Sequence, residues 1–131
     1  MPRVVHFEIH AEDPKRALHF YTAVFGWTSE DWSEITGAPY WGLITGEEGT
    51  PGINGAVLGR TGPNPVVGGP VAGAVLTVEV EDYDDSAAKI LGAGGNIAVP
   101  KQALPGMAWQ GYFYDTESNV FGIHQPDPDA A

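Results

Sequence analysis

VHFEIHAED (residues 5–13) and AVLTVEVED (residues 74–82) are the two stretches that decide the fold of this 131-residue chain. Both alternate apolar and polar side chains, as half-buried β-strands do. Both end in Glu-Asp, and the two Asp residues lie 69 positions apart (82 − 13). A segment with apolar residues at helical spacing follows each of them. The sequence therefore indicates two copies of one strand–helix unit.

The two helices have recognisable start and stop signals. Asp13 and Asp82 can cap helix N-termini with their carboxylates, and Pro14 occupies a first-turn position where its missing N–H does no harm. Gly26 is a natural stop for the first helix, and glycines close the second within residues 83–95. We predict one amphipathic helix after the first strand of each half.

The rest of each half consists of short apolar or alternating runs, which we predict to be strands. They cover residues 28–32, 40–45 and 54–59 in the first half, and 96–100, 109–115 and 119–125 in the second. Residues 61–73 are rich in glycine and proline and read as a linker. We expect the tail, 127–131, to fray.

These segments give one domain over residues 1–131, with a first module at about 3–60 and a second at about 74–126. Each module has the order βαβββ, with one helix available to cover one face of its sheet. Phe7 and Ile9 point to one face of the first strand, and His6, Glu8 and His10 point to the other. We expect the uncovered face to carry the function.

The charge is strongly acidic, with 6 basic and 17 acidic side chains and a net charge of −11. Such a surface repels phosphate backbones and excludes nucleic acid as a partner, while it attracts cationic ligands. The chain has no cysteine, which excludes disulfides and thiolate chemistry. No apolar run is long enough for a membrane span and the start has no signal-peptide layout, so we expect a cytoplasmic protein.

Residues 3–126 resemble the vicinal oxygen chelate superfamily, which includes glyoxalase I, bleomycin-resistance proteins, fosfomycin-resistance transferases and extradiol dioxygenases. The resemblance rests on HFEIHAEDPKRALHFYTAVFGW (6–27), VLTVEVEDYDDSAAKILGAGG (75–95) and DTESNVFGIHQ (115–125). The FYTAVFGW and NVFG segments are most similar to the glyoxalase-like branch related to lactoylglutathione lyase. Together with the repeat, the resemblance implies an α+β fold: two tandem βαβββ modules forming an eight-stranded, cup-shaped mixed sheet with helices on the outer face. It also implies a homodimer.

The resemblance further implies a divalent metal on the concave sheet, and its ligand positions can be followed in this chain. His6, seven residues before Asp13, matches the first ligand position. Its counterpart in the second half is Val75, and Gly122 stands where the family carries a metal-binding glutamate. One imidazole does not hold a catalytic metal. We therefore expect no cofactor, with a divalent metal kept as the alternative.

The candidate catalytic residues are His6, Glu8 and His124, because two imidazoles and a carboxylate on matching strand faces form an acid/base group or a relocated metal site. Structural roles as hydrogen-bonded wall residues are the alternative for all three. The offset of 69 also maps Tyr40 onto Trp109 and Ile44 onto Phe113. The predicted ligand-binding cavity includes residues from four strands: Tyr40, Val75, Thr77, Trp109, Phe113 and Gly122. Residues 101–110 are a candidate lid.

Two functions follow. The first is a protein like the bleomycin-resistance proteins, which binds a small organic molecule, favoured to be cationic, without metal chemistry. The alternative is a glyoxalase-like lyase or isomerase that uses His6 with a relocated metal or an acid/base pair.

Overall fold

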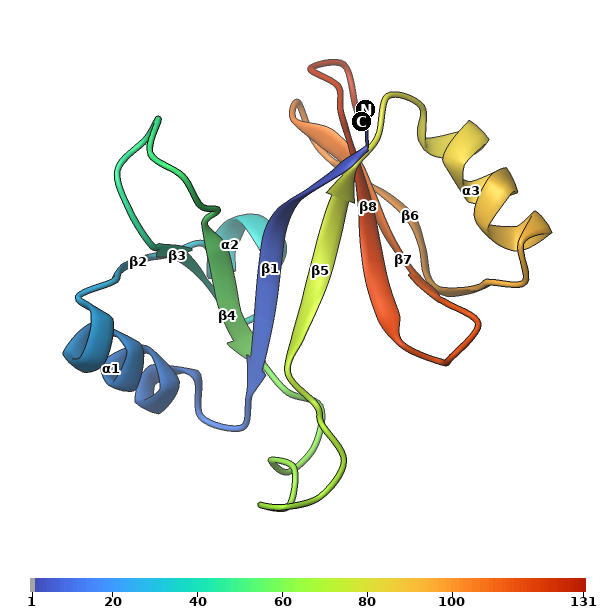
Figure 1. Ribbon diagram of the computed structural model, residues 1–131. Helices are drawn as coiled ribbons and strands as arrows, with labels where there is room; N and C mark the ends of the chain where they lie inside the picture. The colour runs from blue at the N-terminus through green and yellow to red at the C-terminus, as the bar shows by residue number, and fades with distance from the viewer. Residues whose placement is uncertain (1) are drawn as a thin grey trace. The chain divides into compact units, whose positions relative to one another are not determined.

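The computed structural model describes residues 2–131 and contains eight strands and three helices in that part of the chain (Figure 1). The chain divides into two compact units: an N-terminal unit, His6–Ala74, and a C-terminal unit, Val75–Ala131 together with the chain up to Val5. Each unit has the element order βαβββ, with one short extra helix in the N-terminal unit. The predicted α+β fold built from two such modules is confirmed, while the cup shape stays a prediction.

The N-terminal unit contains β1 (Arg3–Ala11), α1 (Pro14–Phe25), β2 (Thr28–Asp31), α2 (Ser33–Thr36), β3 (Tyr40–Ile44) and β4 (Gly55–Gly59). The strands lie in the order β2-β3-β4-β1. β1 and β4 pair in parallel, and the other two pairs are antiparallel. The first residues of β1, up to Val5, are grouped with the other unit.

The C-terminal unit repeats this pattern with β5 (Ala74–Glu79), α3 (Tyr83–Gly92), β6 (Asn96–Leu104), β7 (Ala108–Tyr114) and β8 (Val120–Pro126). Its strands lie in the order β5-β8-β7-β6. The first and last strands of the module, β5 and β8, pair in parallel, and the remaining pairs are antiparallel. The two units therefore share one pairing scheme as well as one element order.

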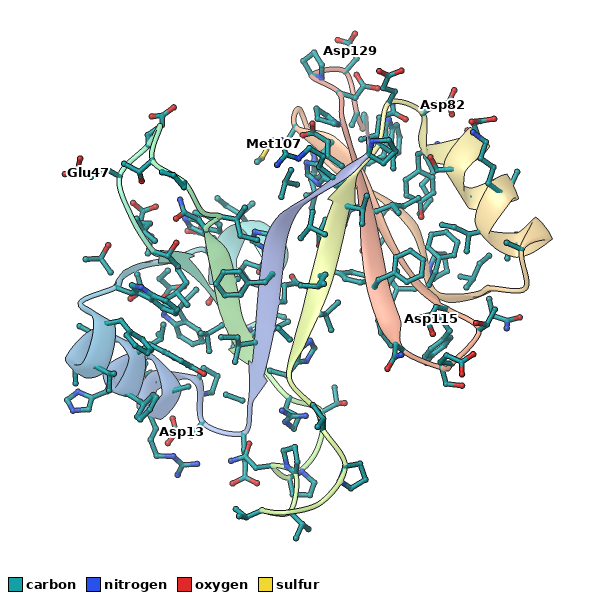
Figure 2. All side chains as sticks on the ribbon, in the orientation of Figure 1. Asp13, Glu47, Asp82, Met107, Asp115 and Asp129 are labelled. Carbon is teal, nitrogen blue, oxygen red and sulfur yellow. The ribbon has the colours of Figure 1, made fainter. Side chains whose placement is uncertain are left out.

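The predicted caps hold both long helices in place. The Asp13 carboxylate accepts a hydrogen bond from the Arg16 backbone N–H at 3.1 Å, and the Asp82 carboxylate accepts one from Asp85 at 2.9 Å. Figure 2 labels both aspartates where α1 and α3 begin. Gly26 ends α1 with a φ of 73°, a left-handed conformation that glycine adopts without strain.

Each unit has its own apolar core, which lies between its sheet and its helix. The core of the N-terminal unit consists of Ala11, Leu18, Leu43 and Val57, with Phe7 and Ile9 packed against it. The core of the C-terminal unit consists of Val80, Tyr83, Phe113 and Ile123, with Val78, Ala87 and Ile90 packed against it. Burying the helix-facing side of each sheet leaves the opposite side for polar side chains.

The predicted frayed tail is wrong, and residues 101–110, the candidate lid, form a strand connection, which was the alternative interpretation. Strand β6 continues to Leu104 and β7 starts at Ala108, so residues 101–110 are a tight hairpin. The tail packs onto that hairpin: the Gly106 N–H donates to the Ala130 carbonyl at 2.8 Å, and Ala130 is 3% exposed. Backbone hydrogen bonds and burial hold this segment, and its terminal position in the sequence gave no sign of them.

Residues 61–73 contain no helix or strand, in agreement with the predicted linker. Asn64 ties this segment to the end of β1, because Asn64 and Glu12 exchange two side-chain to backbone hydrogen bonds of 3.0 and 3.2 Å. Among the described helices, none is long and apolar enough to cross a membrane.

Candidate functional site

A group of polar side chains lies on the sheet face of the N-terminal unit that points away from α1. Phe7 and Ile9 pack in the core beside α1, so the alternating residues His6, Glu8 and His10 lie on the other face. Tyr40 joins them, because both His10 and Tyr40 are paired with Leu58 of β4. We call this surface, made of His6, Glu8, His10 and Tyr40, the polar face. The prediction that His6, Glu8, His10 and Tyr40 point away from the helix-covered face of the sheet is confirmed.

Tyr40 links His6 to Glu8 through a chain of hydrogen bonds. The Tyr40 hydroxyl donates to a carboxylate oxygen of Glu8 at 2.8 Å, and its oxygen lies 2.9 Å from His6 Nε2. A hydroxyl has one proton to give, so His6 Nε2 carries the proton in its own bond to Tyr40. Glu8 is 4% exposed. The arrangement therefore connects an imidazole at one end to a buried carboxylate at the other.

An aromatic side chain that sequence reasoning missed completes this surface. The ring of Trp32 stacks on Tyr40, with centroids 6.3 Å apart and an angle of 15° between the planes. A Cβ added at Gly42 would lie 2.6 Å from the Trp32 ring. Gly42 is thus covered by an indole ring. Nothing in the alternation of residues 28–32 identified Trp32, because it follows the strand and belongs to the turn into α2.

The corresponding face of the C-terminal unit carries different residues from those predicted. The strand register pairs Thr77 with Gly122, Gly122 with Tyr112, and His124 with Gln110, so these five residues point away from α3. Trp109 and Phe113 lie on the other face, in the core against α3. Their placement in a ligand cavity is wrong. The repeat offset of 69 changes by one residue before β7, and a shift of one residue moves every side chain to the opposite face.

Gly122 is enclosed by its neighbours. A Cβ added there would lie 3.0 Å from the Gln110 side-chain nitrogen and 3.1 Å from both Thr77 Oγ1 and the Tyr112 ring. Gly122 is buried, although it faces away from α3. The Thr77 hydroxyl is also buried and has no hydrogen-bond partner in the part of the chain that the structure describes. The expectation that Gly122 borders open space is therefore wrong, because three side chains from β5 and β7 fill that space.

His124 has its own partner in the C-terminal unit. Its Nδ1 lies 2.7 Å from the side-chain oxygen of Gln110, which can only accept, so Nδ1 carries the proton. His6 and Glu8 are brought together in the N-terminal unit, whereas His124 belongs to the other unit. A relocated site that combines all three stays a prediction. Val75 lies in β5 on the same alternation as Thr77.

Folding stability is expected to fall as the pH drops below 6.5, in part through His124. Burial lowers the pKa of His124 below 6.5, and the charge of Glu79 opposes this effect. The unfolded chain therefore binds a proton at a pH where the folded chain does not, so stability is lost between 6.5 and the folded pKa. Urea unfolding of the wild type and of His124→Gln, from roughly pH 7.5 to 5.5, measures how the free energy of unfolding depends on pH in each protein. An unchanged pH dependence in His124→Gln would contradict it.

The residues at the family's metal positions do not fit a divalent ion. His6 is bonded to Tyr40, Val75 offers no donor atom, and Gly122 has no side chain. The three side chains nearest to a Cβ at Gly122 carry an amide, a hydroxyl and a phenol, none of which is a carboxylate or an imidazole. Among those described residues, no group of three or more His, Cys, Asp or Glu side chains converges as a metal site. No chemical step is assigned to a metal here.

Comparison with known proteins supports the fold. A family described as "Bleomycin resistance protein-like N-terminal" matches residues 3–31. Methylmalonyl-CoA epimerase in complex with methylmalonyl-CoA and ammonium has a TM-score of 0.67 at 17% identity, covering 100% of this chain and 99% of that one. The Mycobacterium tuberculosis epimerase has a TM-score of 0.65 at 15% identity, covering 95% of this chain and 88% of that one. None of the curated proteins compared with this chain matches it.

A third structure, a Streptomyces coelicolor methylmalonyl-CoA epimerase variant bound to 2-nitronate-propionyl-CoA, has a TM-score of 0.65 at 19% identity, covering 98% of this chain and 97% of that one. The chain therefore shares its fold with these methylmalonyl-CoA epimerases, and the family match to residues 3–31 agrees with the resemblance to the vicinal oxygen chelate superfamily seen in the sequence. The narrower branch related to lactoylglutathione lyase stays a prediction.

Proposed function

We propose that this chain binds a small organic molecule in the sheet cavity, against the polar face of the N-terminal unit, and does so without a metal. The observation that carries the proposal is the contrast between two positions. His6, at the first metal-ligand position that the resemblance implies, is hydrogen-bonded in the chain that runs through Tyr40 to Glu8. Gly122, at the position of the metal-binding glutamate, is enclosed by neutral side chains.

The polar face suits an organic ligand in two ways. The stacked rings of Trp32 and Tyr40 offer a flat aromatic surface, on which planar groups pack favourably. His6 and Tyr40 supply polar atoms that fix orientation, which is the usual composition of a small-molecule site. The net charge of −11 adds a long-range attraction for ligands that carry a positive group.

Ligand titration followed by calorimetry tests this proposal. The panel comprises bleomycin and planar organic compounds that are cationic, neutral, zwitterionic or anionic, each with and without EDTA. We expect saturable binding of at least one compound that EDTA leaves unchanged. Tyr40→Phe should weaken it by about tenfold, equal to about 1.4 kcal/mol, because the hydroxyl that orients His6 is lost. Tyr21→Phe, on α1 at the opposite side of the sheet, is the matched control. Binding that requires an added metal would overturn the proposal.

A second candidate is a glyoxalase-like lyase or isomerase that uses acid/base chemistry. The observation in its favour is the hydrogen-bonded path from His6 through Tyr40 to the buried Glu8, which could relay a proton at the His6 end. Turnover of the methylglyoxal–glutathione hemithioacetal, measured with and without nickel, zinc, manganese and iron, tests it. Activity that disappears in Glu8→Gln would favour this candidate over simple binding.

We further propose that the chain acts as a homodimer in the cytoplasm. Exposed apolar side chains on α1 support an association surface, since Phe20, Val24 and Phe25 are each more than half exposed. The absence of cysteine from the sequence is compatible with a reducing compartment. Light scattering coupled to size-exclusion chromatography measures the oligomeric state, and a monomer across the concentration range would contradict the dimer.

A further inference from the structure

Arg60 carries a guanidinium on the polar face and forms no ion pair with an acidic side chain of the described residues 2–131. It directly follows β4, where it continues the alternation of Ala56 and Leu58, whose pairing partners include Glu8 and His10. Its backbone N–H donates to the Ala11 carbonyl at 2.9 Å. Its Nη2 donates to the His10 carbonyl at 2.8 Å, which fixes the side chain along the end of β1. Arg60 therefore extends the polar face at the end nearest the linker.

Arg60 differs in burial from Arg3 and Lys15, which also lack an ion pair within residues 2–131 but are exposed. The chain has 17 acidic side chains, and the ion pairs within residues 2–131 use Arg16, Lys89 and Lys101. Arg60 is partly buried, and its Nε has no hydrogen-bond partner in that described part of the chain. A partly buried cation is unfavourable unless an anion or several acceptors compensate it. One backbone carbonyl satisfies only one of its five N–H groups.

Arg60 is the positively charged side chain at this end of the polar face. Burial lowers the pKa of His10, and the charges of Glu8 and Arg60 act on it in opposite directions, so both groups lie within electrostatic reach of His10. Glu8 is already bonded to the Tyr40 hydroxyl. Because lowering the pKa of His10 favours its neutral form, Arg60 is the group that can hold a negative charge at this end of the face.

We infer that Arg60 binds a carboxylate of the ligand, at the end of the polar face that lies beyond Leu58. This inference rests on the proposed small-molecule binding function and narrows the class of ligand to organic acids. A guanidinium presents parallel N–H groups that match a carboxylate, and a singly charged group suits a site with one cation in an acidic chain. Tyr40 is paired with Leu58, so Arg60 lies about 7 Å further along β4, within the span of one small molecule.

An organic acid that also carries a positive group fits both the site and the whole chain. The net charge of −11 attracts the positive group at long range, and Arg60 holds the carboxylate at short range. The stacked rings of Trp32 and Tyr40 provide a surface for a planar ring that joins the positive group of the ligand to its carboxylate. Benzoate and benzamide are suitable probes because they have nearly the same shape and differ in charge.

Amide NMR titrations of the full chain with benzoate and with benzamide test the inference. In the wild type, we expect saturable shifts of polar-face residues with benzoate, and binding of benzamide at least tenfold weaker. Arg60→Gln should weaken benzoate binding at least tenfold and leave benzamide binding unchanged. Arg60→Lys keeps the positive charge but loses the parallel N–H donors of the guanidinium. Its affinity for benzoate should therefore lie between those of the wild type and Arg60→Gln. The amide spectrum itself reports whether each variant is folded, and Arg60→Lys serves if Arg60→Gln does not fold.

Three outcomes would overturn the inference. Equal binding of benzoate and benzamide would show that the site recognises the ring alone, which would leave the proposed binding function standing. Benzoate binding that survives Arg60→Gln would place the acid elsewhere. The absence of saturable binding by benzoate would show that the polar face has no carboxylate subsite. The calorimetric panel would then decide separately whether the chain binds organic ligands of another class.

Discussion

Phe113→Ala is expected to lower the free energy of unfolding by about 3–5 kcal/mol, because it empties the centre of the C-terminal core. Phe113 is 2% exposed and packs between Tyr83 and Phe121, with ring centroids 6.3 and 6.1 Å away. Truncation removes most of the buried apolar surface of the ring and leaves a cavity that the paired strands β7 and β8 cannot close. Urea unfolding followed by circular dichroism gives the value.

Leu91→Ala is the matched control, since Leu91 on α3 is 46% exposed. It should cost less than about 1 kcal/mol. The comparison also distinguishes a position of Phe113 in the core from a position in an open ligand cavity. A loss below about 1 kcal/mol in Phe113→Ala would mean that the ring lines an open cavity, as the sequence repeat suggested, and that the strand register described above is incorrect.

Gly122→Glu is expected to lower the free energy of unfolding by about 2–4 kcal/mol, even though the residue faces away from α3. The new Cβ would press on Gln110, Thr77 and Tyr112 at 3.0–3.1 Å. The carboxylate would then have to leave a buried position or displace the Gln110–His124 hydrogen bond. Thermal and urea unfolding measure the loss.

Gly62→Glu is the matched control for this substitution, because a Cβ at Gly62 meets no atom within 4 Å. It should change stability by no more than about 0.5 kcal/mol. If Gly122→Glu were equally neutral and the variant gained tight metal binding, Gly122 would be the vacated position of an otherwise intact metal site, and the enclosure described here would be wrong.

Much of the fold could be predicted from the sequence because its signals are local. Asp13, Asp82 and Gly26 act through hydrogen bonds and backbone conformation within one turn, so their roles follow from residue type and position. The alternation of β1 is equally local and placed His6 and Glu8 on the correct face. The bond from Tyr40 to both residues depends on strand pairing, which alternation alone does not specify.

The errors arose where long-range pairing decides the structure. A fixed repeat offset was carried into β7, and a change of one residue moved Trp109 and Phe113 from the expected cavity into the core. Trp32 and Arg60 lie just outside the strands, and both are held by contacts with residues of other strands. The enclosure of Gly122 likewise depends on side chains from two other strands.

We propose that this chain, which shares its fold with the methylmalonyl-CoA epimerases, works without a divalent metal at His6. Elemental analysis of untagged protein, purified without chelators and repeated on His6→Ala, tests it most directly. We predict substoichiometric nickel, zinc, manganese and iron in both proteins, also after each metal is added and the excess removed. A stoichiometric metal in the wild type that is lost in His6→Ala would contradict the claim and require a ligand set built around His6.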